Sequence, residues 1–214
     1  FFLGLCAGFG GGCGSGGEPV SFPVGLEPLE SSLAPPPEGD DYPESIVVVE
    51  GERENYSWAH GRAYLHASPQ IIWKALQVAE VVVDRREVDE WTFESEIEPD
   101  FEASFRVHNI VHDVLTVEFD VDWRLGRQNN EDGDLALLAV RFAKTEGTPF
   151  ISLMEGSIVV WPVEQGIYEL EFVEHIAAAQ GGSETIASYL KDLYADVSAW
   201  VHDAPLVEYE DSGA

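Results

Sequence analysis

Six histidines are the residues of this sequence that first suggest metal or acid–base chemistry. His108 and His112 share one face of a strand-like segment, but residues four apart in a strand are separated by about 13 Å, too far to share one metal ion. Glu174 and His175 are sequence neighbours, so a regular strand would point them to opposite faces of a sheet. The histidine spacing therefore predicts no metal site, and we expect neither a metal nor a cofactor.

Other signatures of catalysis or metal binding are also weak. The sequence has no HExxH motif, no paired-cysteine site and no recognisable Ser-His-Asp arrangement, so no catalytic residue is assigned. The acidic loop 128–134 lacks the spacing of an EF-hand, which favours a solvated hairpin over a calcium site. Asp84, Arg85 and Arg86 concentrate charge in an arginine-poor chain. Structural ion pairs are the favoured interpretation, and orientation of an anionic ligand head is the alternative.

Both cysteines, Cys6 and Cys13, lie in a glycine-rich leader formed by residues 1–13. Residues 1–9 are apolar and look like the end of a signal peptide whose beginning precedes Phe1. Cys13, followed by Gly-Ser-Gly, resembles the first residue of a mature bacterial lipoprotein, although Gly10 stands where such signals prefer leucine. We therefore predict lipidation of Cys13, which would anchor a secreted or cell-envelope protein at a membrane. Plain signal cleavage and a Cys6–Cys13 disulfide remain the alternatives.

The charge balance restricts the partners of this chain. Its 40 acidic and 11 basic residues give a formal net charge of −29, which disfavours nucleic acids and anionic lipid surfaces. A solvated acidic surface is favoured over an acidic docking patch. Residues 14–44 are rich in Gly, Pro, Ser and Glu and predict a disordered tether, and residues 204–214 predict an acidic tail. One domain, residues 45–203, remains, and we expect it to be a monomer.

A long amphipathic helix near the end of the chain organises this domain. From Ser183 to His202, apolar residues recur at steps of three and four. Ahead of this helix lie the segments that predict strands: 57–67, 88–97, 101–111, 115–124, 135–144, 149–162 and 166–176, with a short edge piece at 46–52. Polar turns between these segments indicate an antiparallel meander. Ser68 and Pro69 predict the start of a short helix after the first strand.

This order of elements resembles the START-like superfamily, also called SRPBCC, Bet v 1-like or helix-grip. The resemblance is carried by GRAYLHASPQIIWKAL at 61–76 and ETIASYLKDLYADVSAWVH at 184–202, and it covers roughly residues 55–203. It implies an α+β fold in which a curved antiparallel sheet of about seven strands wraps around the last helix. It also implies an apolar cavity between them, which in many relatives holds a lipid or another hydrophobic molecule.

The residues alone partly support the same cavity, because a single helix cannot cover so broad an apolar sheet face. The predicted ligand-cavity residues are Trp91, Phe93, Phe105, Val107, Val117, Phe119, Val121, Trp123, Val140, Phe142, Met154, Leu170, Phe172, Ile186, Leu190, Leu193 and Val197. Non-catalytic binding or transfer of a hydrophobic small molecule or lipid is the preferred function.

Two alternatives to this function remain. One is a polyketide cyclase- or dehydratase-like enzyme in the same cavity, whose proton-handling residue would be among His60, Arg62, Tyr64, His108 and His175. The other is an interaction module whose core is filled by its aromatic side chains.

Overall fold

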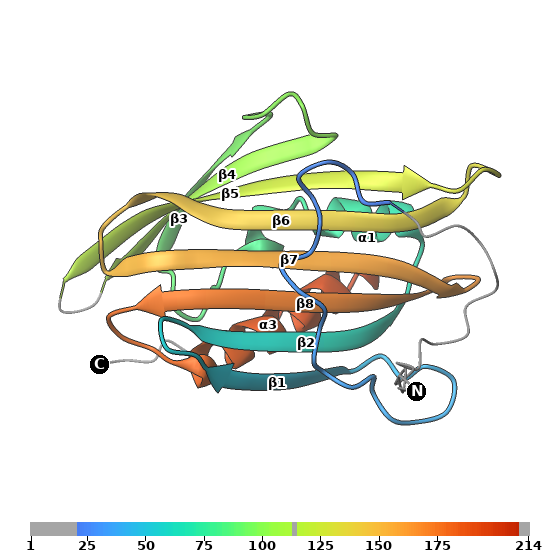
Figure 1. The fold of residues 1–214 in the computed structure, drawn as a ribbon, viewed down its shortest axis with the longest axis horizontal. Coiled ribbons are helices and arrows are strands. Elements are labelled where there is room, and N and C mark those ends of the chain that lie inside the picture. The colour runs from blue at the N-terminus through green and yellow to red at the C-terminus, as the bar shows by residue number, and fades with distance from the viewer. Residues whose placement is uncertain (1–20, 113–114, 210–214) are drawn as a thin grey trace, which may run out of the picture.

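The computed structural model describes residues 21–112 and 115–209 (Figure 1). Within these ranges, eight strands and three helices follow one another along the chain. They are β1 (Ile46–Glu52), β2 (Ser57–His66), α1 (Pro69–Ala75), α2 (Ala79–Val82), β3 (Glu90–Ser95), β4 (Ala103–His112), β5 (Thr116–Asn129), β6 (Leu135–Gly147), β7 (Ile151–Glu164), β8 (Ile167–Ala178) and α3 (Ser183–Val201). None of the described helices is long and apolar enough to cross a membrane.

All eight described strands form one curved antiparallel sheet in the order β1-β2-β8-β7-β6-β5-β4-β3. Strands β3 to β8 form a meander, and the hairpin β1–β2 joins it through ten residue pairs between β2 and β8. Figure 1 shows α3 lying across one face of this sheet, with the short helices on the same side. The predicted α+β helix-grip architecture is confirmed. The predicted edge piece at 46–52 forms the edge strand β1, which brings the sheet from about seven strands to eight.

Small residues on β2 let α3 approach the sheet closely. Ala59 and Ala63 are fully buried, and a Cβ atom at Gly61 would lie only 3.1 Å from Ile46 and 3.2 Å from Phe172. Trp58, His60 and the other alternate residues of β2 face the opposite side. The small side chains on this face of β2 lie against α3.

The ends of the helices follow from local capping. Ser68 Oγ accepts a hydrogen bond from the Ile71 amide at 3.4 Å, and Pro69 occupies the first turn of α1. The α3 N-terminus begins after Gly182, and the Ser183 amide donates to a Glu52 carboxylate oxygen at 3.1 Å. A carboxylate at this position also interacts favourably with the positive end of the helix dipole.

Residues 21–44 lie across the outer face of the sheet, and we call this segment the strap (Figure 1). Leu26 is only 1% exposed and packs against Leu137 and Ala139, above the glycine at position 126. A Cβ at Gly126 would approach the Leu26 side chain to 2.7 Å, so glycine leaves the space that this leucine fills. This placement differs from the predicted disordered tether, because buried contacts offset part of the ordering entropy. Residues 14–20 and Cys13 lie outside the described residues.

Candidate functional site

A cavity of about 70 Å³ lies between the inner face of the sheet and the first turns of α3. Its walls come from the segment around α2, from strands β4 to β8 and from α3. The lining residues are Val82, Val83, Asp84, Val88, Val107, Asn109, Phe119, Val121, Trp123, Phe142, Met154, Glu174, Ile176, Thr185, Ile186 and Tyr189. This volume can hold a few water molecules, whereas pockets for drug-sized ligands measure about 300 to 1,000 Å³. A larger ligand therefore requires side chains to move.

The predicted cavity residues divide into three groups in the structure. Those that line the cavity are Val107, Phe119, Val121, Trp123, Phe142, Met154 and Ile186. Those that are buried in the surrounding core without lining it are Phe105, Val140, Leu170, Phe172, Leu190, Leu193 and Val197. Trp91 and Val117 pack at the margin of the core, and Phe93 is 44% exposed on β3. The second group belongs to the packed core around the cavity, where α3 lies against β1 and β2.

A row of stacked aromatic rings limits the size of the cavity. The Phe105 and Trp123 rings are stacked with centroids 5.7 Å apart, and the Trp123 and Phe142 rings are 4.4 Å apart. The Phe142 ring also lies over Gly156 on the neighbouring strand, where any Cβ would overlap the ring. These rings fill much of the space that the broad sheet leaves beside α3, so rotation of their side chains sets the volume open to a ligand.

Glu174 places a carboxyl group in this apolar cavity. The residue is 1% exposed, and its Oε2 atom has no hydrogen-bond partner among the described residues. Burial, and to a smaller extent the charge of Asp84, raises the pKa of the Glu174 carboxyl well above its ordinary value. The group is therefore held neutral in conditions under which a solvated glutamate is ionised.

A second carboxyl, that of Asp84, lines the same cavity just after α2. Burial raises its pKa to about 6, opposed by the hydrogen bond that it accepts from the Arg86 amide at 3.1 Å. The adjacent arginines pair elsewhere: Arg85 contacts both carboxylate oxygens of Asp196 at 2.7 Å, and Arg86 binds Asp192 at 2.8 Å. The predicted structural ion pairs of this charged segment are present, and Asp84 itself takes no part in them.

Two other polar side chains of the cavity already have partners. The Tyr189 hydroxyl donates to the Val82 carbonyl at 2.8 Å, and the Asn109 amide donates to the Val107 carbonyl at 3.0 Å. Asn109, Tyr189, Asp84 and Glu174 were all missed as cavity residues by the sequence reasoning. For Glu174 a signal existed, because it follows the buried Leu170 and Phe172 at a step of two and therefore shares their inward face.

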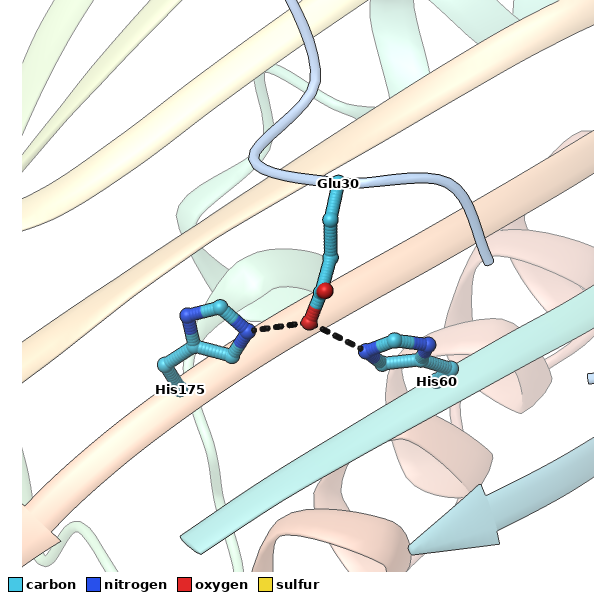
Figure 2. Close-up of side chains that lie close together, drawn as sticks. All are labelled: Glu30, His60 and His175. Carbon is cyan, nitrogen blue, oxygen red and sulfur yellow. Dashed lines mark hydrogen bonds and ion pairs between the residues drawn. The ribbon is translucent and has the colours of Figure 1, made fainter. Parts of the chain in front are cut away.

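A second cluster of titratable side chains lies on the outer face, beneath the strap. Figure 2 shows Glu30 of the strap between His60 of β2 and His175 of β8. Glu30 Oε1 is 3.2 Å from His60 Nε2 and 3.0 Å from His175 Nε2. All three ligand atoms lie within 4.8 Å of one another, so residue types and spacing alone would allow a metal ion.

The hydrogen bonds of His60 favour a metal-free interpretation of this cluster. Its Nδ1 atom accepts a hydrogen bond from the Leu33 amide at 2.9 Å, so the ring proton of the neutral imidazole sits on Nε2 and points to Glu30. A metal at Nε2 would instead require a proton on Nδ1, where the Leu33 N–H already points. The cluster thus fits a hydrogen-bonded clamp between the strap and the sheet better than a metal centre.

None of the residues considered for catalysis lines the cavity. His60 and His175 lie under the strap, and Arg62 forms an ion pair with Glu171. His108 and His112 bind different carboxylates, Asp120 at 2.6 Å and Glu90 at 3.2 Å, and are not brought together. Tyr64 stacks edge-on against the Tyr42 ring of the strap. As the alternation predicts, Glu174 and its neighbour His175 face opposite sides of the sheet.

No protein-family model and no curated protein sequence matches this chain. Solved structures do match it. The human StarD13 lipid transfer and protein localization domain has 10% sequence identity and a TM-score of 0.50, over 76% of this chain and 85% of that one. The human StAR-related lipid transfer protein 5 has 12% identity and a TM-score of 0.51, over 78% and 85% of the two chains. At these identities the likeness concerns the fold alone. The chain therefore has the helix-grip fold of START-like proteins.

Proposed function

We propose that this protein binds a small hydrophobic molecule in the cavity between the sheet and α3, without converting it. Two features support the proposal. The fold is one in which lipid transfer proteins are found, as the names of the two human structures state. The cavity is lined mainly by aliphatic and aromatic side chains, with few polar groups, which is the usual composition of a site for an apolar ligand.

The observation that carries the proposal is the unpartnered carboxyl oxygen of Glu174. A buried polar group without a hydrogen-bond partner costs about 1 to 3 kcal/mol, so it weakens the fold unless something binds to it. Glu174 is the kind of group that fixes the orientation of a ligand in an apolar pocket. A core that served packing alone would place an apolar side chain here, as at Phe172 two residues earlier.

The proposal is tested by ligand retention and uptake. Native mass spectrometry of the purified protein should reveal a bound apolar compound, and emptied protein should take up an environment-sensitive apolar fluorophore. Val121→Phe adds a ring inside the cavity and should reduce uptake. Val163→Phe makes the same change at a position that is 36% exposed and should leave uptake unchanged. Equal uptake by both variants and the unmodified protein would show that the fluorophore binds elsewhere and would contradict the proposal.

A second candidate function, acid–base catalysis in the same cavity, is favoured by one observation. Asp84, with a pKa of about 6, and the more strongly shifted Glu174 are two carboxyls with different protonation tendencies in one pocket. This is the cyclase- or dehydratase-like alternative, in which Asp84 and Glu174, rather than the residues considered from the sequence, would serve as acid and base. A carbonyl compound that the protein converts, and that Glu174→Gln still binds but no longer converts, would establish it.

We also propose that the protein is a monomer anchored in a bacterial cell envelope through a lipid on Cys13. The Cys-Gly-Ser-Gly sequence after an apolar leader supports anchoring. Intact-mass measurement of detergent-extracted protein should show the mass of the acyl chains, and Cys13→Ser should release the protein from the membrane fraction. An unmodified Cys13 would refute anchoring without affecting the cavity, and light scattering tests the monomer.

A further inference from the structure

We propose that the cavity selects a hydrophobic ligand carrying a protonated amine, held by the carboxyls of Glu174 and Asp84. This inference rests on the proposed function, since it requires the cavity to admit a ligand, and it specifies the chemical class. The ligand would place its apolar body among the cavity side chains and its ammonium group against the two carboxyls.

The two carboxyls form a site for a cation, and no side chain that lines the cavity supplies one. Glu174 Oε2 is buried without a partner among the residues that the structure describes, and Asp84 lines the same cavity. No lysine, arginine or histidine lies among the lining residues. A buried carboxylate is stable only when it is paired, so a cationic ligand head supplies what this site lacks.

The two arginines that follow Asp84 in the sequence pair with other carboxylates. Arg85 is held by Asp196, and Arg86 by Asp192, while the Tyr209 ring covers both guanidinium groups at 5.1 and 4.6 Å. Either arginine would have to break these contacts to neutralise Glu174. A fatty acid or another anion would therefore bring its negative charge into a cavity that supplies no counter-ion and, at neutral pH, beside the ionised carboxyl of Asp84, which the Coulomb energy disfavours.

Aromatic rings in the same cavity also suit a cation. Trp123, Phe142, Phe119 and Tyr189 line the same cavity as Glu174. The faces of such rings attract ammonium groups, most strongly for tryptophan and in desolvated sites. The net charge of −29 on the whole chain acts in the same direction, because it draws cations toward the protein and repels anions.

A neutral alcohol is the main competitor, since it could accept the hydrogen bond of a protonated Glu174. The two ligand classes differ in their proton balance. When a protonated amine binds, Glu174 loses its proton to the buffer and forms an ion pair with the ammonium group. When an alcohol binds, Glu174 keeps its proton. Proton release on binding therefore distinguishes the two and is measurable by calorimetry in buffers of different ionisation enthalpy.

The experiment compares phenethylamine, phenethyl alcohol and phenylacetate, which share one ring and differ in the charge of the head group. We expect the amine to bind the full chain about tenfold more tightly than the alcohol, with proton release, and phenylacetate to bind most weakly. Glu174→Gln should abolish both the preference for the amine and the proton release. Glu171→Gln, which removes the same charge from the outer face of β8, should retain both.

Three results separate the inference from the proposed function. Tighter binding of the amine that depends on Glu174 supports both. Equal or tighter binding of the alcohol or phenylacetate overturns the amine inference and leaves the proposed function standing. If none of the three probes binds and the apolar fluorophore is not taken up either, both fail. Circular dichroism of each variant verifies that it is folded.

Discussion

Replacing Glu174 by glutamine should stabilise the empty protein at neutral pH. The substitution keeps the size and shape of the side chain and removes the proton that the buried carboxyl must hold. Because burial raises the pKa of Glu174 well above the ordinary 4.5, folding at neutral pH requires this carboxyl to bind a proton that it lacks in the unfolded chain. Glutamine is neutral in both states and avoids that cost.

The size of the effect follows from the difference between the pH and the unfolded pKa. Each unit of that difference is worth about 1.4 kcal/mol, so the cost at about pH 7 is at most roughly 3 kcal/mol, the limit for a carboxyl that stays protonated in the folded protein. Because the pKa of Glu174 is higher in the folded than in the unfolded chain, its contribution to stability is complete below the unfolded pKa of 4.5. This contribution is lost as the pH rises toward the folded pKa. The stabilisation by glutamine should therefore disappear near pH 4.

Urea unfolding of both proteins at several pH values measures this difference directly. At neutral pH the glutamine variant should have the higher free energy of unfolding, and thermal unfolding should shift upward by at most roughly 6 to 12 °C. A variant equally stable, or less stable, at neutral pH would show that Glu174 has a partner or is solvated. Glu174 would then give no reason to expect a ligand in the cavity.

Three further predictions concern Asp84, the strap and its clamp. Burial raises the Asp84 pKa from 3.8 to about 6, so Asp84→Asn should stabilise the protein by at most about 3 kcal/mol above pH 6 and by nothing below pH 4. Chemical unfolding at the two pH values measures this difference. Leu26→Ala should cost about 2 to 4 kcal/mol in attachment of the strap, which limited proteolysis within residues 21–44 would detect. Burial lowers the His60 pKa, so the clamp between Glu30, His60 and His175 should be stable above about pH 6.5 and weaken as the pH falls further. Lower protection of the Leu33 amide from hydrogen exchange in acid would report this weakening. Protection that does not change with pH would contradict it.

The fold was largely predictable because its signals are local and periodic. The apolar residues of α3 recur at helical spacing, and β5 alternates over many residues, so both elements follow from the sequence alone. The edge strand β1 was only a candidate, because a short apolar run near the start of a domain gives a weak strand signal.

The site was harder to predict because its features depend on contacts between distant residues. Nothing around Leu26 in the sequence marks Gly126 as its partner, one hundred residues away. Likewise, Glu30 meets His60 and His175 only after the sheet has formed. The cavity volume depends on side-chain packing, here the Trp123–Phe142 stack, which no hydrophobic pattern encodes. For Glu174 the alternation of β8 contains a usable signal, which the sequence analysis did not apply to the cavity.

The chain offers one direct measurement of whether the cavity is a binding site. Met154 is its single methionine and lines the cavity, so a carbon-13 label on the methionine methyl group gives one nuclear magnetic resonance signal from inside the site. Titration with phenethylamine should move this signal to saturation, and Val121→Phe should suppress the change. A ligand that binds without moving the Met154 signal, or a signal that responds to no apolar compound, would contradict the account.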